Sequence, residues 1–217
     1  MEFHQTVPMN DTASSPSKSL PSLNILLTGV GGQGTILASN IVAEVGVALG
    51  YDVKKAEVHG MSQRGGSVVS QVRWGRQVFS PIIPPGEADY LIAFEKLEAL
   101  RALSYLRPGG QIIVDPHAIP PVTVTSGDAH YPEDETIQVQ LARITPHVHW
   151  IPGVAIAEEL GNAKAANVVL LGAFSALLNH DPDLWLGVIR QRVPEKYREL
   201  NEQAFARGRD LILTGPR

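Results

Sequence analysis

The chain has 217 residues, a formal net charge of −4 and no cysteine. Its length suffices for one sizeable hydrophobic core, and its scattered lysines and arginines argue against nucleic acid as the main partner, because nucleic-acid-binding proteins concentrate them on one face. Without cysteine the chain cannot form a disulfide, use a nucleophilic thiol or ligate an iron–sulfur cluster through thiolates, so any such redox centre must belong to another chain.

The first 22 residues are rich in Ser, Pro, Thr and Asn. They lack the basic start and the roughly 7–15-residue apolar core of a secretory signal. We expect a flexible extension at 1–22 and a single domain at 23–217. Apolar stretches fall short of the roughly 20 residues that a membrane span needs, which predicts a soluble, cytoplasmic protein with no membrane partner.

An apolar run at 24–28 leads through a glycine-rich turn into a helical pattern that begins near Thr35 and stops at Gly50. Downstream, apolar periodicity predicts strands at 51–58, 67–74, 90–94, 111–115 and 147–151, and helices at 95–106, 133–144, 155–160, 163–178, 182–192 and 194–210. Pro194 is expected at the first position of the last helix. This alternation predicts an α/β, Rossmann-like fold: a mostly parallel sheet with helices on both faces and a helical C-terminal part.

The segment Gly-Val-Gly-Gly-Gln-Gly at residues 29–34 forms the glycine loop, which joins the first strand to its helix. A helix N-terminus after such a turn offers backbone N–H groups to a phosphate or carboxylate. Glu57 lies near the position of a ribose-binding acid, so an NAD or FAD site is one interpretation. Binding of another anion is a second, and a turn that serves only close helix–sheet packing is a third.

The second loop (residues 59–66) reads His-Gly-Met-Ser-Gln-Arg-Gly-Gly and follows the second predicted strand. At that sheet edge Arg64 could clamp a carboxylate or phosphate through two parallel hydrogen bonds, although a solvated surface arginine is the simpler interpretation. His59 and Ser62 could add hydrogen bonds. Their spacing matches no nucleophilic triad, and the sequence predicts neither a catalytic residue nor a metal site.

Asn167 interrupts an otherwise nearly apolar helical stretch at 163–178. A helix that is apolar almost all round is expected to be buried or to face another subunit, and a buried asparagine there needs a hydrogen-bond partner. An interface role and a helix-capping role both fit this position.

Four ordered segments carry a resemblance to a known family: Gly-Val-Gly-Gly-Gln-Gly at 29–34, Glu-Val-His-Gly-Met-Ser-Gln-Arg-Gly-Gly at 57–66, Ala-Asp-Tyr-Leu-Ile-Ala-Phe-Glu at 88–95 and Asn-Val-Val-Leu-Leu-Gly-Ala at 167–173. Together they resemble the gamma-type subunits of 2-oxoacid:ferredoxin oxidoreductases. The second segment, Arg-Val-Pro-Glu-Lys at 192–196 and residues 201–208 are most similar to the indolepyruvate branch of that family. The likeness runs from about residue 23 to residue 210.

The resemblance implies a hetero-oligomeric enzyme that oxidatively decarboxylates aryl 2-oxoacids to acyl-coenzyme A and reduces ferredoxin. Thiamine diphosphate and iron–sulfur clusters are then expected on a large alpha subunit and not on this chain, with coenzyme A as the co-substrate that this chain helps to bind or gate. The implied ligand-binding residues are Gly29, Gly31, Gly32, Gln33, Gly34, His59, Ser62, Arg64, Gly65 and Gly66, with Glu95 and Asn167 at the interface or in support. Two alternatives stay open: a self-sufficient NAD- or FAD-binding oxidoreductase, and a non-catalytic scaffold subunit.

Overall fold

The computed structural model describes residues 21–59 and 66–215. Its strands are β1 (Leu23–Val30), β2 (Asp52–His59), β3 (Ser67–Gly75), β4 (Ala88–Ala93), β5 (Leu106–Val114) and β6 (Val148–Trp150). Its α-helices are α1 (Thr35–Ala48), α2 (Lys96–Arg101), α3 (Val122–Thr125), α4 (Asp134–Ile144), α5 (Gly153–Glu159), α6 (Ala166–Leu177), α7 (Pro182–Arg192) and α8 (Arg198–Thr214). Short 3₁₀ turns lie at Leu103–Tyr105, Ala163–Ala165 and Glu195–Tyr197.

The strands form one mixed sheet in the order β2-β3-β1-β4-β5-β6. The pairs β1–β4, β4–β5 and β5–β6 are parallel, whereas β3 is antiparallel to both β1 and β2. Of these six strands, only β3 therefore runs against the others. The predicted Rossmann-like fold with a mostly parallel sheet is confirmed.

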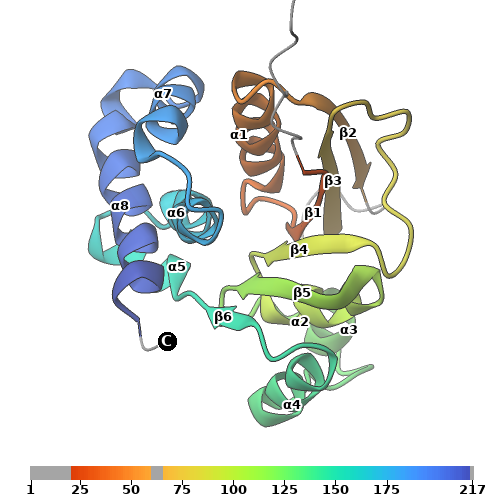
Figure 1. The fold of residues 1–217 in the computed structure, drawn as a ribbon. Helices are drawn as coiled ribbons and strands as arrows, with labels where there is room; N and C mark the ends of the chain where they lie inside the picture. The colour runs from red at the N-terminus through yellow and green to blue at the C-terminus, as the bar shows by residue number, and fades with distance from the viewer. Residues whose placement is uncertain (1–20, 60–65, 216–217) are drawn as a thin grey trace, which may run out of the picture.

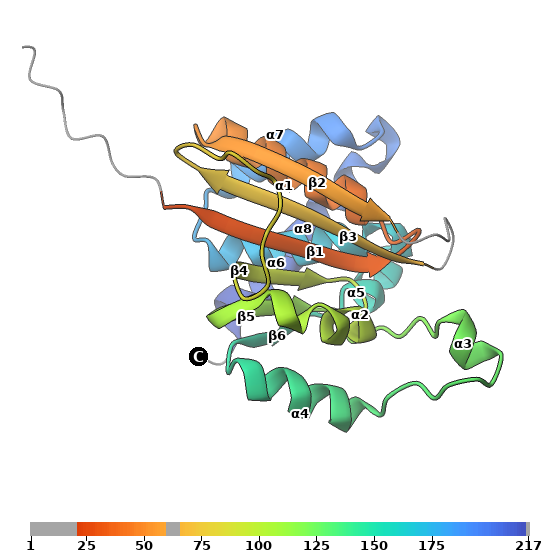
Figure 2. The same ribbon diagram turned by 90° about the vertical axis from the view of Figure 1, so that its right-hand side faces the viewer.

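Both faces of the sheet are covered (Figures 1 and 2). Helices α1 and α6 lie on one face with α7 and α8 packed outside them, and α2 and α4 lie on the other face at the β4–β6 side. Each face of the sheet has its own hydrophobic core, and successive strand residues alternate between them. Ile25 and Leu27 belong to the core shared with α1, α6, α7 and α8, whereas Leu26 belongs to the core shared with α2 and α4. Because each buried side chain of this size contributes about 1.5–3 kcal/mol, two-sided burial explains why these strands read as continuous apolar runs.

The element boundaries differ from the sequence prediction most at two places. The helix predicted at 95–106 ends at Arg101, a 3₁₀ turn follows, and β5 begins at Leu106, opposite Ala88 of β4. A register shift next to this pair accommodates the Pro-Gly-Gly sequence at 108–110, which lies within β5. Pro194 precedes a 3₁₀ turn and does not start α8, which begins at Arg198.

Helices α6 and α8 pack backbone against backbone. A Cβ atom added to Gly208 would lie 1.8 Å from the carbonyl oxygen of Val169, and one added to Gly172 would lie 2.1 Å from that of Phe205. Both glycines are therefore required for this close approach, which fixes α6 beside the sheet.

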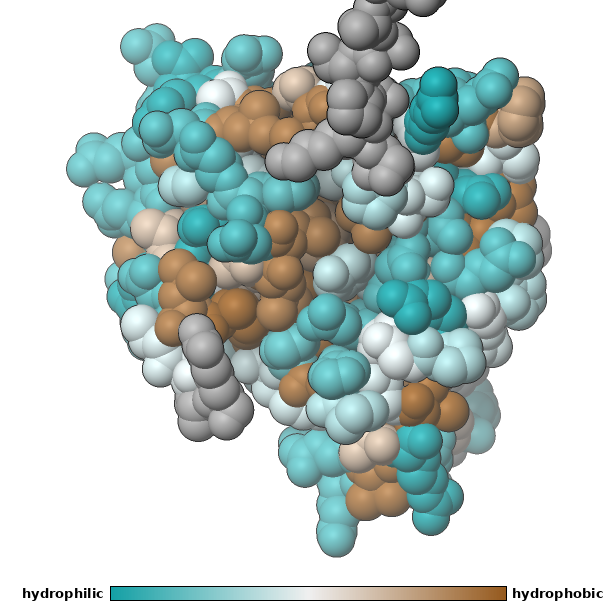
Figure 3. Space-filling view, viewed as in Figure 1, coloured by the Kyte–Doolittle hydropathy of each residue, from teal (hydrophilic) through white to brown (hydrophobic). Residues whose placement is uncertain are grey.

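The face seen in Figure 1 contains the amino edge of the sheet. In the space-filling view of Figure 3, apolar side chains gather over the helical side of this face, among hydrophilic ones. The carboxyl ends of the parallel strands point to the opposite edge, as Figure 2 shows. Along residues 21–59 and 66–215, no helix combines the length and apolar character needed to cross a membrane.

Candidate functional site

The glycine loop lies at the carboxyl end of β1, beside the end of β4. The chain leaves β1 for α1 on one face of the sheet and leaves β4 for α2 on the other, which makes this the crevice where ligands of open α/β sheets bind. Gly32 and Gly34 have φ angles of +105° and +80°, which side chains rarely adopt. Within the described chain, Gly34 caps α1 without a side-chain hydrogen bond, and the first turn holds no acidic residue. This helix end therefore suits an anion.

Gln33 stabilises the glycine loop through two side-chain hydrogen bonds. Its Oε1 accepts a hydrogen bond from the backbone N–H of Val30 at 2.8 Å, and its Nε2 donates to the carbonyl oxygen of Phe94 at 2.6 Å. A Cβ atom on Gly29 would lie 2.9 Å from Gln33 Oε1, so a side chain there would displace the Gln33 amide. The sequence predicts that Gln33 orients a ligand; its observed contacts make it a residue that positions the loop.

Asn167 holds the same loop from the helical layer. It lies at the second position of α6, is 2% exposed, and its Nδ2 donates to the carbonyl oxygen of Gly34 at 3.2 Å. A Cβ atom on Gly34 would lie 2.3 Å from that Nδ2. Asn167 is therefore not a helix cap, a role that Asn162 fills for the preceding 3₁₀ turn. Sequence reasoning could not find this contact, because its partners are 133 residues apart.

Glu95 supports the adjacent chain segments. Its buried carboxylate accepts from the backbone N–H of Glu98 at 2.8 Å, which caps α2, and from the N–H of Ile119 at 3.1 Å. The Tyr131 hydroxyl also donates to it; burial and this bond to a carboxylate raise the pKa of Tyr131. Glu95 thus ties the segment 116–131, which carries α3 away from the sheet, to the end of β4 (Figure 2).

The two glycine-rich loops meet through their backbones. The N–H of Gly31 donates to the carbonyl oxygen of Gly66 at 2.9 Å. A pocket of about 320 Å³ beside this contact is lined by Val30, Gly31, Gly32, Gly34, Thr35, Ile36 and Val68. The predicted contributions of Ser62, Arg64, Gly65 and the His59 side chain lie outside the described residues and stay predictions.

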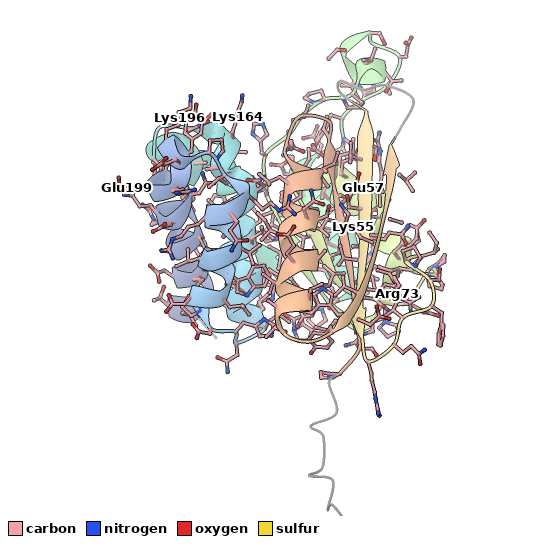
Figure 4. All side chains as sticks on the ribbon, turned by 90° about the horizontal axis from the view of Figure 1, so that it is seen from above. Lys55, Glu57, Arg73, Lys164, Lys196 and Glu199 are labelled. Atoms are coloured by element: carbon pink, nitrogen blue, oxygen red, sulfur yellow. The ribbon has the colours of Figure 1, made fainter. Side chains whose placement is uncertain are left out.

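A second pocket, the switch-point pocket, has a volume of about 240 Å³ and opens on the other side of the glycine loop. Its walls come from the ends of β4 and β5 and the starts of α5 and α6. They include Gly32, Gln33, Phe94, Asp115, His117, Ile119, Val154, Glu158, Lys164 and Asn167. Figure 4, in which the carboxyl ends of the parallel strands point upward, places Lys164 at this edge of the molecule.

Asp115 is the polar wall residue that the sequence analysis missed. It is 2% exposed, and its two carboxylate oxygens accept from the N–H groups of His117 and Val154, each at 2.9 Å. Burial raises its pKa, although these hydrogen bonds oppose the shift. Its place as the last residue of the strand predicted at 111–115 was the available signal, because functional polar residues gather at the carboxyl ends of parallel strands.

Glu57 does not lie where a dinucleotide site requires it. Strand β3 separates β2 from β1, so Glu57 is two strands away from the strand that carries the glycine loop. Lys55 forms an ion pair with Glu57 and also donates to Asn40 of α1 (Figure 4). This strand order weakens the NAD or FAD interpretation, in which the acid follows the strand next to β1.

A glycine loop at the switch point of a mostly parallel sheet defines the chain as a Rossmann-like α/β protein. The family model for pyruvate ferredoxin/flavodoxin oxidoreductase matches residues 24–211, and the chain belongs to this family. It is 40% identical over 192 residues to the indolepyruvate oxidoreductase subunit IorB of Thermococcus kodakarensis, covering 85% of this chain and 93% of the relative.

Solved structures agree with this assignment. The gamma subunit of a keto/oxoacid ferredoxin oxidoreductase from Geobacter sulfurreducens PCA superimposes with a TM-score of 0.66 at 25% identity, over 89% of this chain and 99% of that chain. A 2-oxoglutarate:ferredoxin oxidoreductase from Magnetococcus marinus, with 2-oxoglutarate, coenzyme A and succinyl-CoA bound, gives a TM-score of 0.69 at 22% identity, over 90% of this chain and 32% of that one; it shows the fold alone. The chain is thus a small subunit of a 2-oxoacid:ferredoxin oxidoreductase, which confirms the sequence prediction.

Proposed function

We propose that the chain assists a large partner subunit in the oxidative decarboxylation of indolepyruvate or a related aryl 2-oxoacid to acyl-coenzyme A in the cytoplasm, with ferredoxin as electron acceptor. The observation that carries this proposal is the 40% identity, over 93% of its length, to a relative named as an indolepyruvate oxidoreductase subunit. The lack of cysteine supports placing thiamine diphosphate and the iron–sulfur clusters on the partner.

The chain's own contribution is to bind or gate coenzyme A. The N-terminus of α1, whose N-cap Gly34 brings no side-chain hydrogen bond and follows another glycine with positive φ, supports a seat for a phosphate group of that co-substrate. Arg64, if it lies near this seat, would add a bidentate contact. A subunit without cofactor ligands can still accelerate the reaction in this way, by positioning a co-substrate and excluding water.

Co-expression with a thiamine-dependent large subunit tests the function. The purified complex should reduce ferredoxin when supplied with an arylpyruvate, and the rate should rise when coenzyme A is added. Either chain alone should be inactive. Activity that requires NAD, with no response to coenzyme A, would contradict the proposal and favour the self-sufficient dinucleotide enzyme.

Arg64→Ala separates ligand binding from subunit docking. We expect a higher KM for coenzyme A in a complex that still assembles, as measured by native mass spectrometry and steady-state rates. Arg76→Ala is the matched control, because Arg76 is exposed just after β3, at the opposite edge of the sheet, and should change neither property. Loss of assembly in Arg64→Ala, with an unchanged KM in whatever complex remains, would instead support the scaffold alternative.

A further inference from the structure

The two outer strands of the sheet differ in length and regularity. Strand β6 has three residues, whereas β2 has eight, and all eight pair with β3 without a register shift. Within the described chain, no strand pairs with the outer side of β2, which lies at the margin of the sheet in Figure 2. A long, regular outer strand presents unpaired backbone N–H and C=O groups, to which a strand of another chain can add.

The side chains of β2 restrict which strand can add to it. A second copy related by a two-fold axis perpendicular to the sheet runs antiparallel and places one residue opposite its own counterpart. Among registers that overlap by at least five residues of β2, a centre at Lys54 or Lys55 opposes two lysines, and a centre at Glu57 opposes two glutamates. A centre at Ala56 avoids this and places Lys55 of each copy opposite Glu57 of the other. Opposite charges in directly facing positions stabilise a strand pair, and like charges destabilise it.

Lys55 and Glu57 already lie together at this edge. Their side chains form an ion pair within β2, each is 22% exposed, and both lie beside α1 in Figure 4. Lys55 also donates to Asn40 of α1, which holds the pair on the helix side of the strand. In the pairing centred on Ala56, two such ion pairs meet and each lysine gains a second carboxylate. Partly buried charges are screened by salt less than fully exposed ones, so they discriminate among registers.

Helix α1 adds an exposed stripe next to the same edge. Ile36, Asn40, Ala43 and Val47 recur at the spacing of one helix face, and Ile36 and Val47 are 41% and 61% exposed. The hydrogen bond from Lys55 to Asn40 fixes this stripe beside β2. A two-fold axis perpendicular to the sheet keeps the helices of both copies on the same side. Pairing of the two β2 strands therefore brings both apolar stripes to the joint.

We propose that two copies of this chain associate through their β2 edges, antiparallel and centred on Ala56, so that one sheet continues through both copies. The exposed stripes of the two α1 helices flank the joint on one side. The contact is isologous and closes after two copies, and the lysines of β2 make the alternative registers repulsive. A contact of this size is small, so the association is reversible. It depends neither on the ligand nor on the reaction proposed above.

Sedimentation equilibrium of the full chain tests the pairing. We expect the 23.4 kDa chain to approach twice that mass at about 100 µM. Lys55→Glu and Glu57→Lys each oppose like charges and should stay monomeric alone, with folding checked by circular dichroism. Mixed in equal amounts, the two variants should dimerise, because every pair across the joint then joins a glutamate to a lysine.

This mixing experiment separates contacts between chains from contacts within one strand. Each variant loses the ion pair within β2, and mixing cannot restore it, so dimerisation of the mixture requires the charges to meet across two chains. A monomeric wild-type chain at every concentration up to about 500 µM would overturn the proposal, since even weak specific contacts are populated there. A dimeric wild type whose variants fail to pair when mixed would overturn the register centred on Ala56.

Val47→Asp tests the stripe without altering β2. Because this side chain is exposed, the variant should fold normally, and we expect its dimer dissociation constant to rise roughly tenfold. Val122→Asp is the matched control, because Val122 is 74% exposed in α3, away from β2 (Figure 2), and its dissociation constant should be unchanged. Equal increases in the two variants would indicate nonspecific association of apolar side chains and contradict the proposed joint.

Discussion

Helix α6 contacts its neighbours in two different ways. Along its length it packs against α8 through Gly172 and Gly208, where the helix backbones approach so closely that no Cβ atom fits. At its start it approaches the glycine loop through a single polar contact, from Asn167 to Gly34. The first contact excludes every other group, whereas the second borders a pocket of about 240 Å³.

The difference shows that one helix can make a contact that closes completely at one point and a contact that leaves space beside it at another. The absence of a side chain permits close helix packing at Gly172 and Gly208. At Gly34 it makes room for the Asn167 amide, whose Oδ1 has no hydrogen-bond partner among the described residues. Burying an unpaired acceptor is disfavoured in a core and useful at a binding site. Changes at the α8 contact should therefore affect folding, and changes at the loop contact should also affect ligand binding.

The largest effect is expected from Gly208→Ala. The new methyl group would meet the Val169 carbonyl at 1.8 Å, so the helices must separate, which should cost about 3 kcal/mol or more of unfolding free energy. Gly187→Ala in α7, where no atom lies within 4 Å, is the control and should stabilise the chain by about 0.5–1 kcal/mol through helix propensity. Urea unfolding of the purified chain measures both. Similar values for the two variants would mean that α6 and α8 do not pack this closely.

A smaller loss of stability is expected from Gly34→Ala, which combines positive-φ strain with a clash against Asn167. Gly32→Ala shares the strain but meets no atom within 4 Å, and should cost about 1–3 kcal/mol. Gly34→Ala should cost about 1 kcal/mol more, because the Asn167 amide must move. Adding Asn167→Ala should recover that extra cost, as a double-mutant cycle of unfolding free energies would show. Strict additivity would argue against the contact.

Gln33→Glu tests the two hydrogen bonds by which Gln33 holds the glycine loop, with a smaller change than the glycine substitutions. The carboxylate can still accept from Val30 but no longer donates to the Phe94 carbonyl, so we expect a loss of about 1 kcal/mol. Denaturant unfolding at neutral pH measures it. Gln33→Ala removes both bonds and should cost more than Gln33→Glu. The reverse order would indicate that charge repulsion, and not the lost donor, dominates at this position.

The smallest effect concerns the buried charge at the pocket. Burial raises the folded-state pKa of Asp115 above the ordinary value of 3.8, so the folded protein holds this proton more tightly than the unfolded chain does. The stabilisation is fully present below the ordinary pKa and is lost as pH rises through the raised one. Unfolding free energies between pH 3 and pH 7 should therefore decline more in the wild type than in Asp115→Asn. Parallel curves would contradict the shift.

Local patterns predicted the elements around the site well. Alternation and glycine placement identified β1, the glycine loop and α1, and the boundaries of α7 match the predicted helix at 182–192. The helix predicted at 95–106 includes α2 but extends too far, because strand pairing of β5 with β4 takes over from Leu106. Of the predicted binding residues, the structure brings Gly31, Gln33, Gly34 and Gly66 together with Asn167, and none of their ligand roles is yet tested.

The amino-acid sequence by itself determined the glycine loop, the family membership carried by four ordered motifs, and the inability of this chain to hold an iron–sulfur cluster through thiolates. These properties depend on residue identity and local backbone requirements, so they can be read along the chain. The tertiary structure alone decided that β3 separates Glu57 from the loop, that Asp115 borders the pocket, and that Asn167 reaches Gly34. Strand order and contacts between residues far apart in the chain arise from packing of the whole sheet, which periodicity within a single segment does not encode.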